Sequence, residues 1–163
     1  MPKASVTVEK GTRQVVFNRG GLNQRPSQDR VLALLKDALA GEVAHIAELR
    51  GASQEQLQLA AQSIDTELVL QRSSVLRVLR DWRAQRVNDE QVRWWALLMS
   101  IGAFPDDWTP HGWRVHHSHP PVRIDYSDEV GHVVSGLRDL GDFDDVGRSA
   151  ADIDQLIRQL SDS

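Results

Sequence analysis

The sequence predicts a mainly α fold, a helical bundle with a small N-terminal β-hairpin. After residue 26, apolar residues recur at three- and four-residue spacing in successive segments, most of which begin with a side chain able to cap a helix. Over residues 5–17, valines alternate with polar residues, which is the period of a strand. A chain of 163 residues with 40% hydrophobic content is long enough for one main core. We therefore expect a hairpin extension and linker over 1–26 and one helical domain over 27–163.

The predicted hairpin places Val6 and Val8 before Gly11, and Val15 and Phe17 after it. Two strands alone are only marginally stable in water. We therefore expect this hairpin to dock on the helical body, to pair with another chain or to stay mobile. The glycines and the proline that follow it are typical of a linker.

The first helices are predicted from their ends. Ser27 is placed to cap a helix that Gly41 ends, and a shorter helical segment follows over 42–50. Ser53 and Gln56 match a capping box, which begins a glutamine-rich helix. We expect the glutamines of that helix to form a solvated face.

A longer helix is predicted over 65–86, with leucines and valines on one side and arginines largely on the other. Asn88 caps the next helix and Gly102 ends it. This second helix contains Trp94 and Trp95, which cannot both face one core because neighbouring positions on a helix point in different directions. We expect one of the two to hold the following loop or to mark an exposed contact site.

An irregular loop is expected over 103–121, where prolines and histidines interrupt the helical pattern. Its bulky Trp108 and Trp113 require burial, so the loop is expected to pack across the bundle. Residues 122–126 are expected to be briefly extended. A helix is then predicted over 128–140, and Ser149 is placed to cap a last one.

Charge is distributed unevenly along the chain. Residues 120–163 hold ten carboxylates against four arginines, whereas the whole chain has a net charge of −4, so the first 119 residues are close to neutral. A concentrated field of one sign guides association with a partner of the opposite sign. We therefore expect a basic partner.

The acidic residues of interest form two clusters. The first consists of Asp125, Asp128 and Glu129, and the second of Asp142, Asp144 and Asp145. Paired carboxylates can perform acid–base catalysis or bind a hard cation, but both tasks require a cleft or a defined ligand spacing. Carboxylates in solvated turns beside helix ends rarely provide either. The sequence therefore predicts a binding surface, with no catalytic residue, no metal and no cofactor.

Two other classes of function are left open. His111, His116, His117 and His119 could serve a metal-dependent enzyme, although their spacing matches no standard metal motif. The arginines of the predicted helix 65–86 could contact nucleic-acid phosphates, as in a regulator or adaptor. Acidic residues interrupt those arginines, so direct nucleic-acid binding is not the expected role.

The compartment is predicted from what the composition lacks. There is no cysteine, which fits a reducing environment, and no apolar run is long enough for a signal peptide or a membrane span. We expect a cytoplasmic protein that does not insert into a membrane.

The runs VLRDWRAQRVNDEQVRWWALLM and VRIDYSDEVGHVVSGLRDLGDF resemble bacterial immunity proteins of the colicin D and contact-dependent growth inhibition type. The residues that carry the resemblance are Asp89, Glu90, Val92, Trp95, Ala96, Ile124, Asp125, Tyr126, Val133, Leu137, Leu140 and Asp142.

This resemblance implies a small protein of bacterial competition that binds a cognate toxin domain, commonly a basic nuclease, and neutralises it. An acidic surface suits that task because a nuclease cleft is basic in order to hold phosphates. The expected partner-binding residues are the two acidic clusters together with Tyr126, which would be the aromatic contact.

Overall fold

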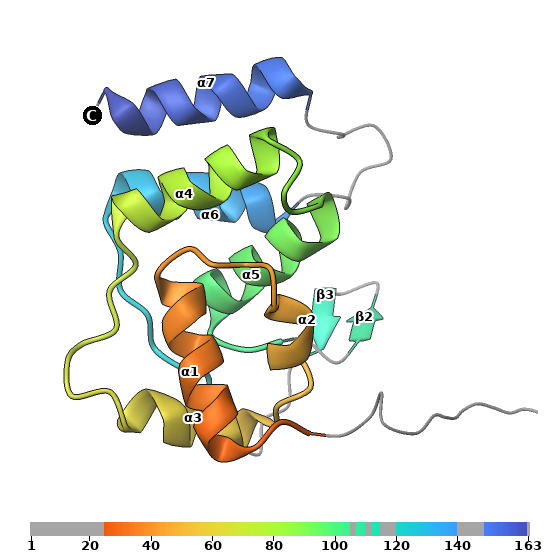
Figure 1. The fold of residues 1–163 in the computed structure, drawn as a ribbon, viewed down its shortest axis with the longest axis vertical. Helices are drawn as coiled ribbons and strands as arrows, with labels where there is room; N and C mark the ends of the chain where they lie inside the picture. Colours follow the sequence, from red (N-terminus) through yellow and green to blue (C-terminus); the bar gives the residue numbers. More distant parts are fainter. Residues whose placement is uncertain (1–24, 105–106, 110–111, 115–119, 140–148, 163) are drawn as a thin grey trace, which may run out of the picture.

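The protein is described by a computed structural model, which places residues 25–104, 107–109, 112–114, 120–139 and 149–162. The described residues are mainly α, as predicted (Figure 1). The helices are α1 (Gln28–Leu39), α2 (Ile46–Leu49), α3 (Gln54–Gln62), α4 (Arg72–Arg83), α5 (Asp89–Ile101), α6 (Asp128–Arg138) and α7 (Ala150–Ser161), with two short strands, β2 (Asp107–Thr109) and β3 (Gly112–Arg114), between α5 and α6. The hairpin expected over 5–17 lies outside the described residues.

The helix starts predicted from capping residues are confirmed. Ser27, Ser53, Asn88 and Ser149 each accept a hydrogen bond from a backbone N–H in the first turn of the following helix. At Ser53, Asn88 and Ser149 the third helical residue also bonds back to the capping residue, which completes a capping box. These bonds satisfy N–H groups that have no partner inside the helix, so local sequence decides where these helices begin.

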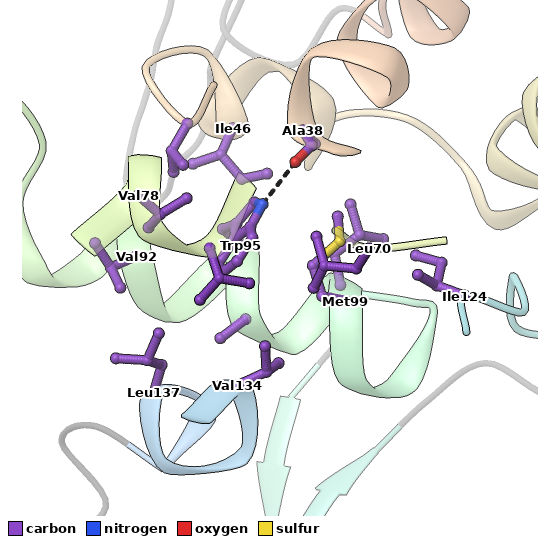
Figure 2. Packing of buried hydrophobic residues seen from close by; sticks show 14 of the residues in the cluster. Ala38, Ile46, Leu70, Val78, Val92, Trp95, Met99, Ile124, Val134 and Leu137 are labelled. Carbon is purple, nitrogen blue, oxygen red and sulfur yellow. Dashed lines mark hydrogen bonds between the residues drawn. The ribbon is translucent and has the colours of Figure 1, made fainter. Parts of the chain in front are cut away.

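Helix α5 lies at the centre of the bundle, against α6 on one side and α2 on another (Figures 1 and 2). Its Trp95 is fully buried, and the indole Nε1 donates to the carbonyl oxygen of Ala38 at 2.8 Å. This bond satisfies the indole N–H, which would be costly to bury alone. The core residues labelled around it are Ile46, Leu70, Val78, Val92, Met99, Ile124, Val134 and Leu137.

Two glycines allow the chain to pass close to other backbone. Gly41 and Gly102 follow α1 and α5 with φ angles of 84° and 70°. A Cβ atom on Gly102 would lie 1.9 Å from the carbonyl oxygen of Val122, and one on Gly41 would lie 2.3 Å from that of Ser74. Both positions therefore require glycine for conformation and for space.

The predicted helix over 65–86 is wrong at its start. Helix α4 begins at Arg72, and the chain before it is extended at Val69, which forms a parallel bridge with Asp125. Leu68 and Leu70 are buried whereas Val69 is 39% exposed, so burial alternates as in a strand. Pairing with a segment distant in the sequence, which the helical pattern did not reveal, determines this conformation. The brief extension expected over 122–126 is confirmed at the same bridge.

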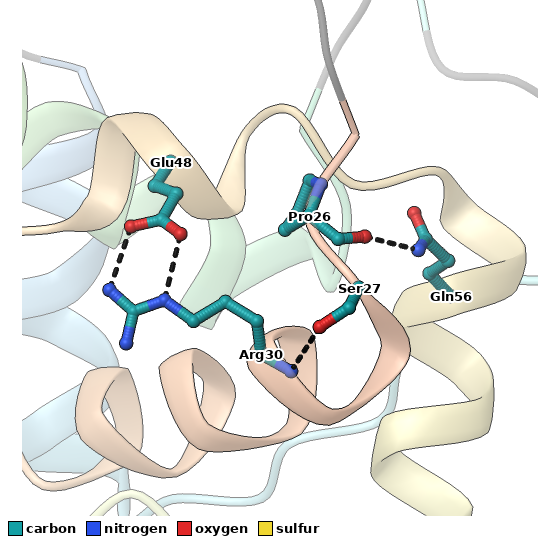
Figure 3. Close-up of polar contacts among 5 residues, drawn as sticks. All are labelled: Pro26, Ser27, Arg30, Glu48 and Gln56. Carbon is teal, nitrogen blue, oxygen red and sulfur yellow. Dashed lines mark hydrogen bonds and ion pairs between the residues drawn. The ribbon is translucent and has the colours of Figure 1, made fainter.

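Three of the glutamines expected on a solvated face, Gln54, Gln56 and Gln58, instead hold loops in place. In α3, the side chain of Gln54 donates to the carbonyl oxygens of Gly102 and Pro120, at 3.1 Å in each case. Gln56 donates to that of Pro26 at 2.8 Å, beside the pair of hydrogen bonds that joins Arg30 to Glu48 (Figure 3). The amides thus supply donors to loop carbonyls, and at Gly102 they add to the backbone hydrogen bond from Val122.

The expectation for the adjacent tryptophans is confirmed. Trp95 is buried, whereas Trp94 is half-buried and its ring centroid lies 6.2 Å from that of Phe104, at the start of the segment 103–121. The guanidinium of Arg50 stacks over the Trp94 ring at 3.4 Å, and burial lowers the pKa of Arg50. Strands β2 and β3 pair in that segment with Trp108 opposite Trp113.

Candidate partner-binding surface

The structure describes four of the seven residues predicted to bind a partner. Asp125, Tyr126, Asp128 and Glu129 lie together where the extended segment enters α6. The second predicted cluster, Asp142, Asp144 and Asp145, lies outside the described residues.

Asp125 is held by its backbone. Its N–H donates to the carbonyl oxygen of Leu68 at 2.8 Å, and its carbonyl oxygen accepts from the N–H of Leu70 at 2.9 Å. Its side chain accepts from Nε of Arg123 at 3.1 Å. The carboxylate remains 47% exposed, so it is available at the surface.

Glu67 is a further exposed carboxylate beside the bridge, and the sequence interpretation missed it. Glu67 is exposed and lies two residues before Val69, the bridge partner of Asp125. The signal that could have identified it is the short apolar run of Leu68, Val69 and Leu70 between polar residues, which is compatible with a short strand as well as with a helix. We define the acidic edge as Glu67, Asp125, Asp128 and Glu129.

Asp128 and Glu129 occupy the first turn of α6, where the helix dipole favours negative charge. Ser127 caps this helix by accepting from the N–H of Val130 at 3.4 Å. Glu129 forms an ion pair with Arg72, the first residue of α4, and its side chain is 53% exposed. Asp128 is exposed. The acidic edge is therefore only partly neutralised by the neighbouring arginines.

Tyr126 is half-buried and packs against the hydrophobic core. Its ring passes so close to Gly131 of α6 that a Cβ atom there would lie 2.8 Å from Cε2 of the ring. Part of the ring is thus committed to packing within the chain. Only its exposed part is available for the contact predicted from the sequence.

Several arginines of α4 and of the turn after it face acidic residues of the same molecule. Arg77 pairs with Glu42 at 3.2 Å, Arg83 with Asp154 of α7 at 2.9 Å, and Arg86 with Asp81 at 2.6 Å. These pairs are exposed, so each one contributes little to stability. They do reduce the positive potential that phosphate binding would require.

A separate groove of about 640 Å³ lies between the turn after α4 and the start of α7. It is lined in part by Trp82, Gln85, Asp89 and Ile153, and by none of the residues of the acidic edge. The Trp82 indole N–H donates to the Asp89 carboxylate at 2.7 Å, so these two polar groups of the groove are already bonded to each other. This arrangement provides no paired acid and base, and we assign no chemistry to the groove.

Among the residues that the structure describes, no group of three or more histidine, aspartate or glutamate side chains could hold a metal ion. The predicted alternative at His111, His116, His117 and His119 lies outside those residues. In the same part of the chain, no helix is both long enough and apolar enough to cross a membrane.

Comparison with known proteins places the chain in no family. No protein-family model, no curated protein and no solved structure matches it.

Proposed function

We propose that this protein is an immunity protein that binds a cognate bacterial toxin, a basic nuclease, and blocks it by covering the substrate cleft. The observation that carries the proposal is the acidic edge, where the carboxylates of Glu67, Asp125, Asp128 and Glu129 flank one bridge between two distant parts of the chain. The resemblance of the runs around Trp95 and Tyr126 to such proteins supports the same class. The protein would act in the cytoplasm, where the toxin acts on nucleic acid.

The physical basis of the proposal is charge substitution. A nuclease cleft is lined by lysine and arginine, and carboxylates can occupy the positions of the substrate phosphates. Charge complementarity accelerates encounter and suppresses binding to acidic proteins. Asp125 suits this role because both of its backbone hydrogen bonds hold it at a fixed position while its carboxylate stays exposed.

The alternative of a nucleic-acid-associated regulator is less well supported. It would rely on the arginines of the predicted helix 65–86, of which Arg77, Arg83 and Arg86 face carboxylates within the molecule. A gel shift at two salt concentrations tests it, since phosphate binding weakens steeply with salt. Salt-sensitive binding of DNA or RNA by the isolated protein would favour the alternative.

The proposal is tested with the protein encoded directly upstream of this chain's gene. Its C-terminal domain should be basic, should cut DNA or RNA, and should lose that activity when one equivalent of this protein is added. Calorimetry measures the affinity. Absence of both binding and inhibition would overturn the proposal.

The acidic edge is tested in the same assay with matched charge reversals. Glu67→Lys with Asp128→Lys should weaken binding about tenfold or more, since each reversal turns an attraction into a repulsion. The control is Asp29→Lys with Asp162→Lys, which changes the net charge equally at exposed positions. Asp29 lies in the first turn of α1 as Asp128 does in α6, so any cost to a helix start is matched.

The second predicted cluster requires its own variant. Changing Asp142, Asp144 and Asp145 to lysine should weaken binding while the helical content, measured by circular dichroism, stays the same. Unchanged affinity would remove these three residues from the binding surface.

A further inference from the structure

We propose that the chain segment 67–71 is a docking edge to which an extended, basic segment of the partner adds as a strand beside Val69. The inference deepens the proposed function and rests on it, since the partner meant is the same toxin. It specifies how the acidic edge would recognise that partner: main-chain hydrogen bonds give the alignment, and charge gives the selectivity.

The backbone geometry at Val69 carries the inference. In the parallel bridge, the hydrogen bonds run from Asp125 to Leu68 and from Leu70 to Asp125. The N–H and C=O of Val69 itself therefore point to the opposite side of the strand. Within the described part of the chain, neither group forms a hydrogen bond. One donor and one acceptor thus lie open at the edge.

The side chain of Val69 adds to this edge. It is 39% exposed. Among the described residues, Val69 and Leu59 are the large hydrophobic residues that are exposed. A β-branched side chain on an open strand packs well against a residue of an added strand. The neighbouring Leu68 and Leu70 are buried in the core, which holds the strand in an extended conformation before any partner arrives.

The charges around the edge specify the chemistry of the added segment. Glu67 lies two residues before Val69 on the strand, and Asp125 lies directly opposite it. Asp128 and Glu129 follow at the start of α6. An added strand would lie next to Glu67, whereas Asp125, Asp128 and Glu129 lie beyond the strand on its paired side. The field of these carboxylates would attract lysine or arginine at alternate positions of the added strand and would repel an acidic strand.

The free edge is tested with the full chain and a synthetic probe, the acetylated and amidated peptide Lys-Val-Arg-Val-Lys-Val-Lys. Adding it to ¹⁵N-labelled protein should shift the amide resonances of residues 67–71 and slow hydrogen exchange at Val69. Three results would overturn the inference: no binding, shifts that lie elsewhere, or a Val69 amide already protected without peptide. The last would mean that another part of the chain occupies the edge.

The hydrogen bond is tested by Val69→Pro, with Val69→Thr as the matched control. Proline removes the outward N–H, which forms no hydrogen bond in the described structure, and proline is tolerated where an edge N–H faces solvent. The peptide's dissociation constant should rise about tenfold for Val69→Pro, as expected for one lost hydrogen bond, and stay within about twofold for Val69→Thr. Equal binding by both variants would overturn the inference.

A second probe avoids reliance on that substitution. A peptide N-methylated at every residue cannot donate a backbone hydrogen bond from either edge, and one with glutamate in place of every lysine and arginine reverses the charge. Both should bind the unmodified protein at least about tenfold more weakly, and equal binding by either would count against strand addition. If the upstream nuclease binds the protein and Val69→Pro equally well, this inference fails while the proposed function stands. If it binds neither, both fail.

Discussion

Helices α3 and α4 are both rich in polar side chains, but they use them differently. The glutamines of α3 donate to backbone carbonyls of distant segments, as Gln54 does to Gly102 and Gln58 does to Pro120. The arginines of α4 form ion pairs with exposed carboxylates, as Arg83 does with Asp154. Neutral amides therefore hold irregular backbone in place, while charged groups neutralise one another at the surface.

The two kinds of polar contact contribute differently to stability. A loop carbonyl that is shielded from water needs a donor, and removing that donor costs free energy. An exposed ion pair replaces contacts with water by nearly equivalent contacts within the protein, so its net contribution to the free energy of folding is small. We therefore expect substitutions on the glutamine side of the molecule to have larger effects than substitutions on the arginine side.

The largest effect is expected at Gly102, whose carbonyl oxygen accepts from Gln54. Gly102→Ala should lower the free energy of unfolding by about 3 kcal/mol or more, because the φ angle of 70° is unfavourable for alanine and the new Cβ would clash with the Val122 carbonyl. Urea unfolding measures the change. A decrease in the free energy of unfolding below about 1 kcal/mol would mean that the backbone at Gly102 and the backbone at Val122 can move apart to make room for the methyl group.

The contribution of the α3 glutamines to stability is tested by Gln54→Ala. This variant loses the bonds to Gly102 and Pro120, whose carbonyl oxygens keep a second donor in the Val122 N–H and in Gln58. It should therefore lower the free energy of unfolding by about 1 kcal/mol. The matched control is Gln62→Ala, an exposed glutamine of the same helix, for which we expect a change within about 0.5 kcal/mol. Equal effects at the two positions would remove the distinction between bonded and solvated glutamines.

A smaller effect is expected for the ion pair between Arg83 and Asp154. Both side chains are more than one third exposed, at 46% and 40%. A double-mutant cycle with Arg83→Gln and Asp154→Asn should give a coupling below about 1 kcal/mol that decreases in 1 M salt. A larger coupling that does not depend on salt would mean that this ion pair contributes as much to stability as the hydrogen bonds of the α3 glutamines.

The smallest effect is expected from the pair that joins α1 to α2 (Figure 3). The hydrogen bonds from Arg30 lower the pKa of Glu48 below its usual 4.5. Because the pKa of Glu48 is lower in the folded state than in the unfolded state, the pair stabilises the fold above the unfolded-state pKa of 4.5. This contribution is lost as the pH falls through the pKa of the folded state. Glu48→Gln should therefore lower the melting temperature more at pH 6 than at pH 3. An equal change at both values would show that the charge of Glu48 is immaterial.

The parts of the fold that local rules govern were predictable from the sequence. Ser53 and Asn88 mark helix starts because each cap acts on a backbone group only three residues away. Gly102 marks a helix end because few other residues adopt its φ angle. The mainly α class follows from such local signals together with the apolar spacing.

The parts that distant contacts govern were not predictable. The bridge between Val69 and Asp125 joins segments that are separated by α4 and α5, and one sequence contains no information on which segments meet. The error at 65–71 followed from this, because Leu68 and Leu70 were assigned to the apolar side of the following helix, although their two-residue spacing fits a strand when a partner strand is present. Of the candidate site, Asp125, Asp128 and Glu129 were predicted from charge alone, whereas Glu67 joins them only through the bridge.

The same bridge has a consequence for the order in which the protein matures. Synthesis proceeds from the N-terminus, so residues 67–71 leave the ribosome long before Asp125 does. Until then the carbonyl oxygen of Leu68 and the N–H of Leu70 lack their hydrogen-bond partner Asp125, and both side chains lack part of the core that later surrounds them. The acidic edge therefore comes into existence late, and a nascent chain that ends after α5 would contain Glu67 and Val69 but no surface of the kind proposed to bind the toxin.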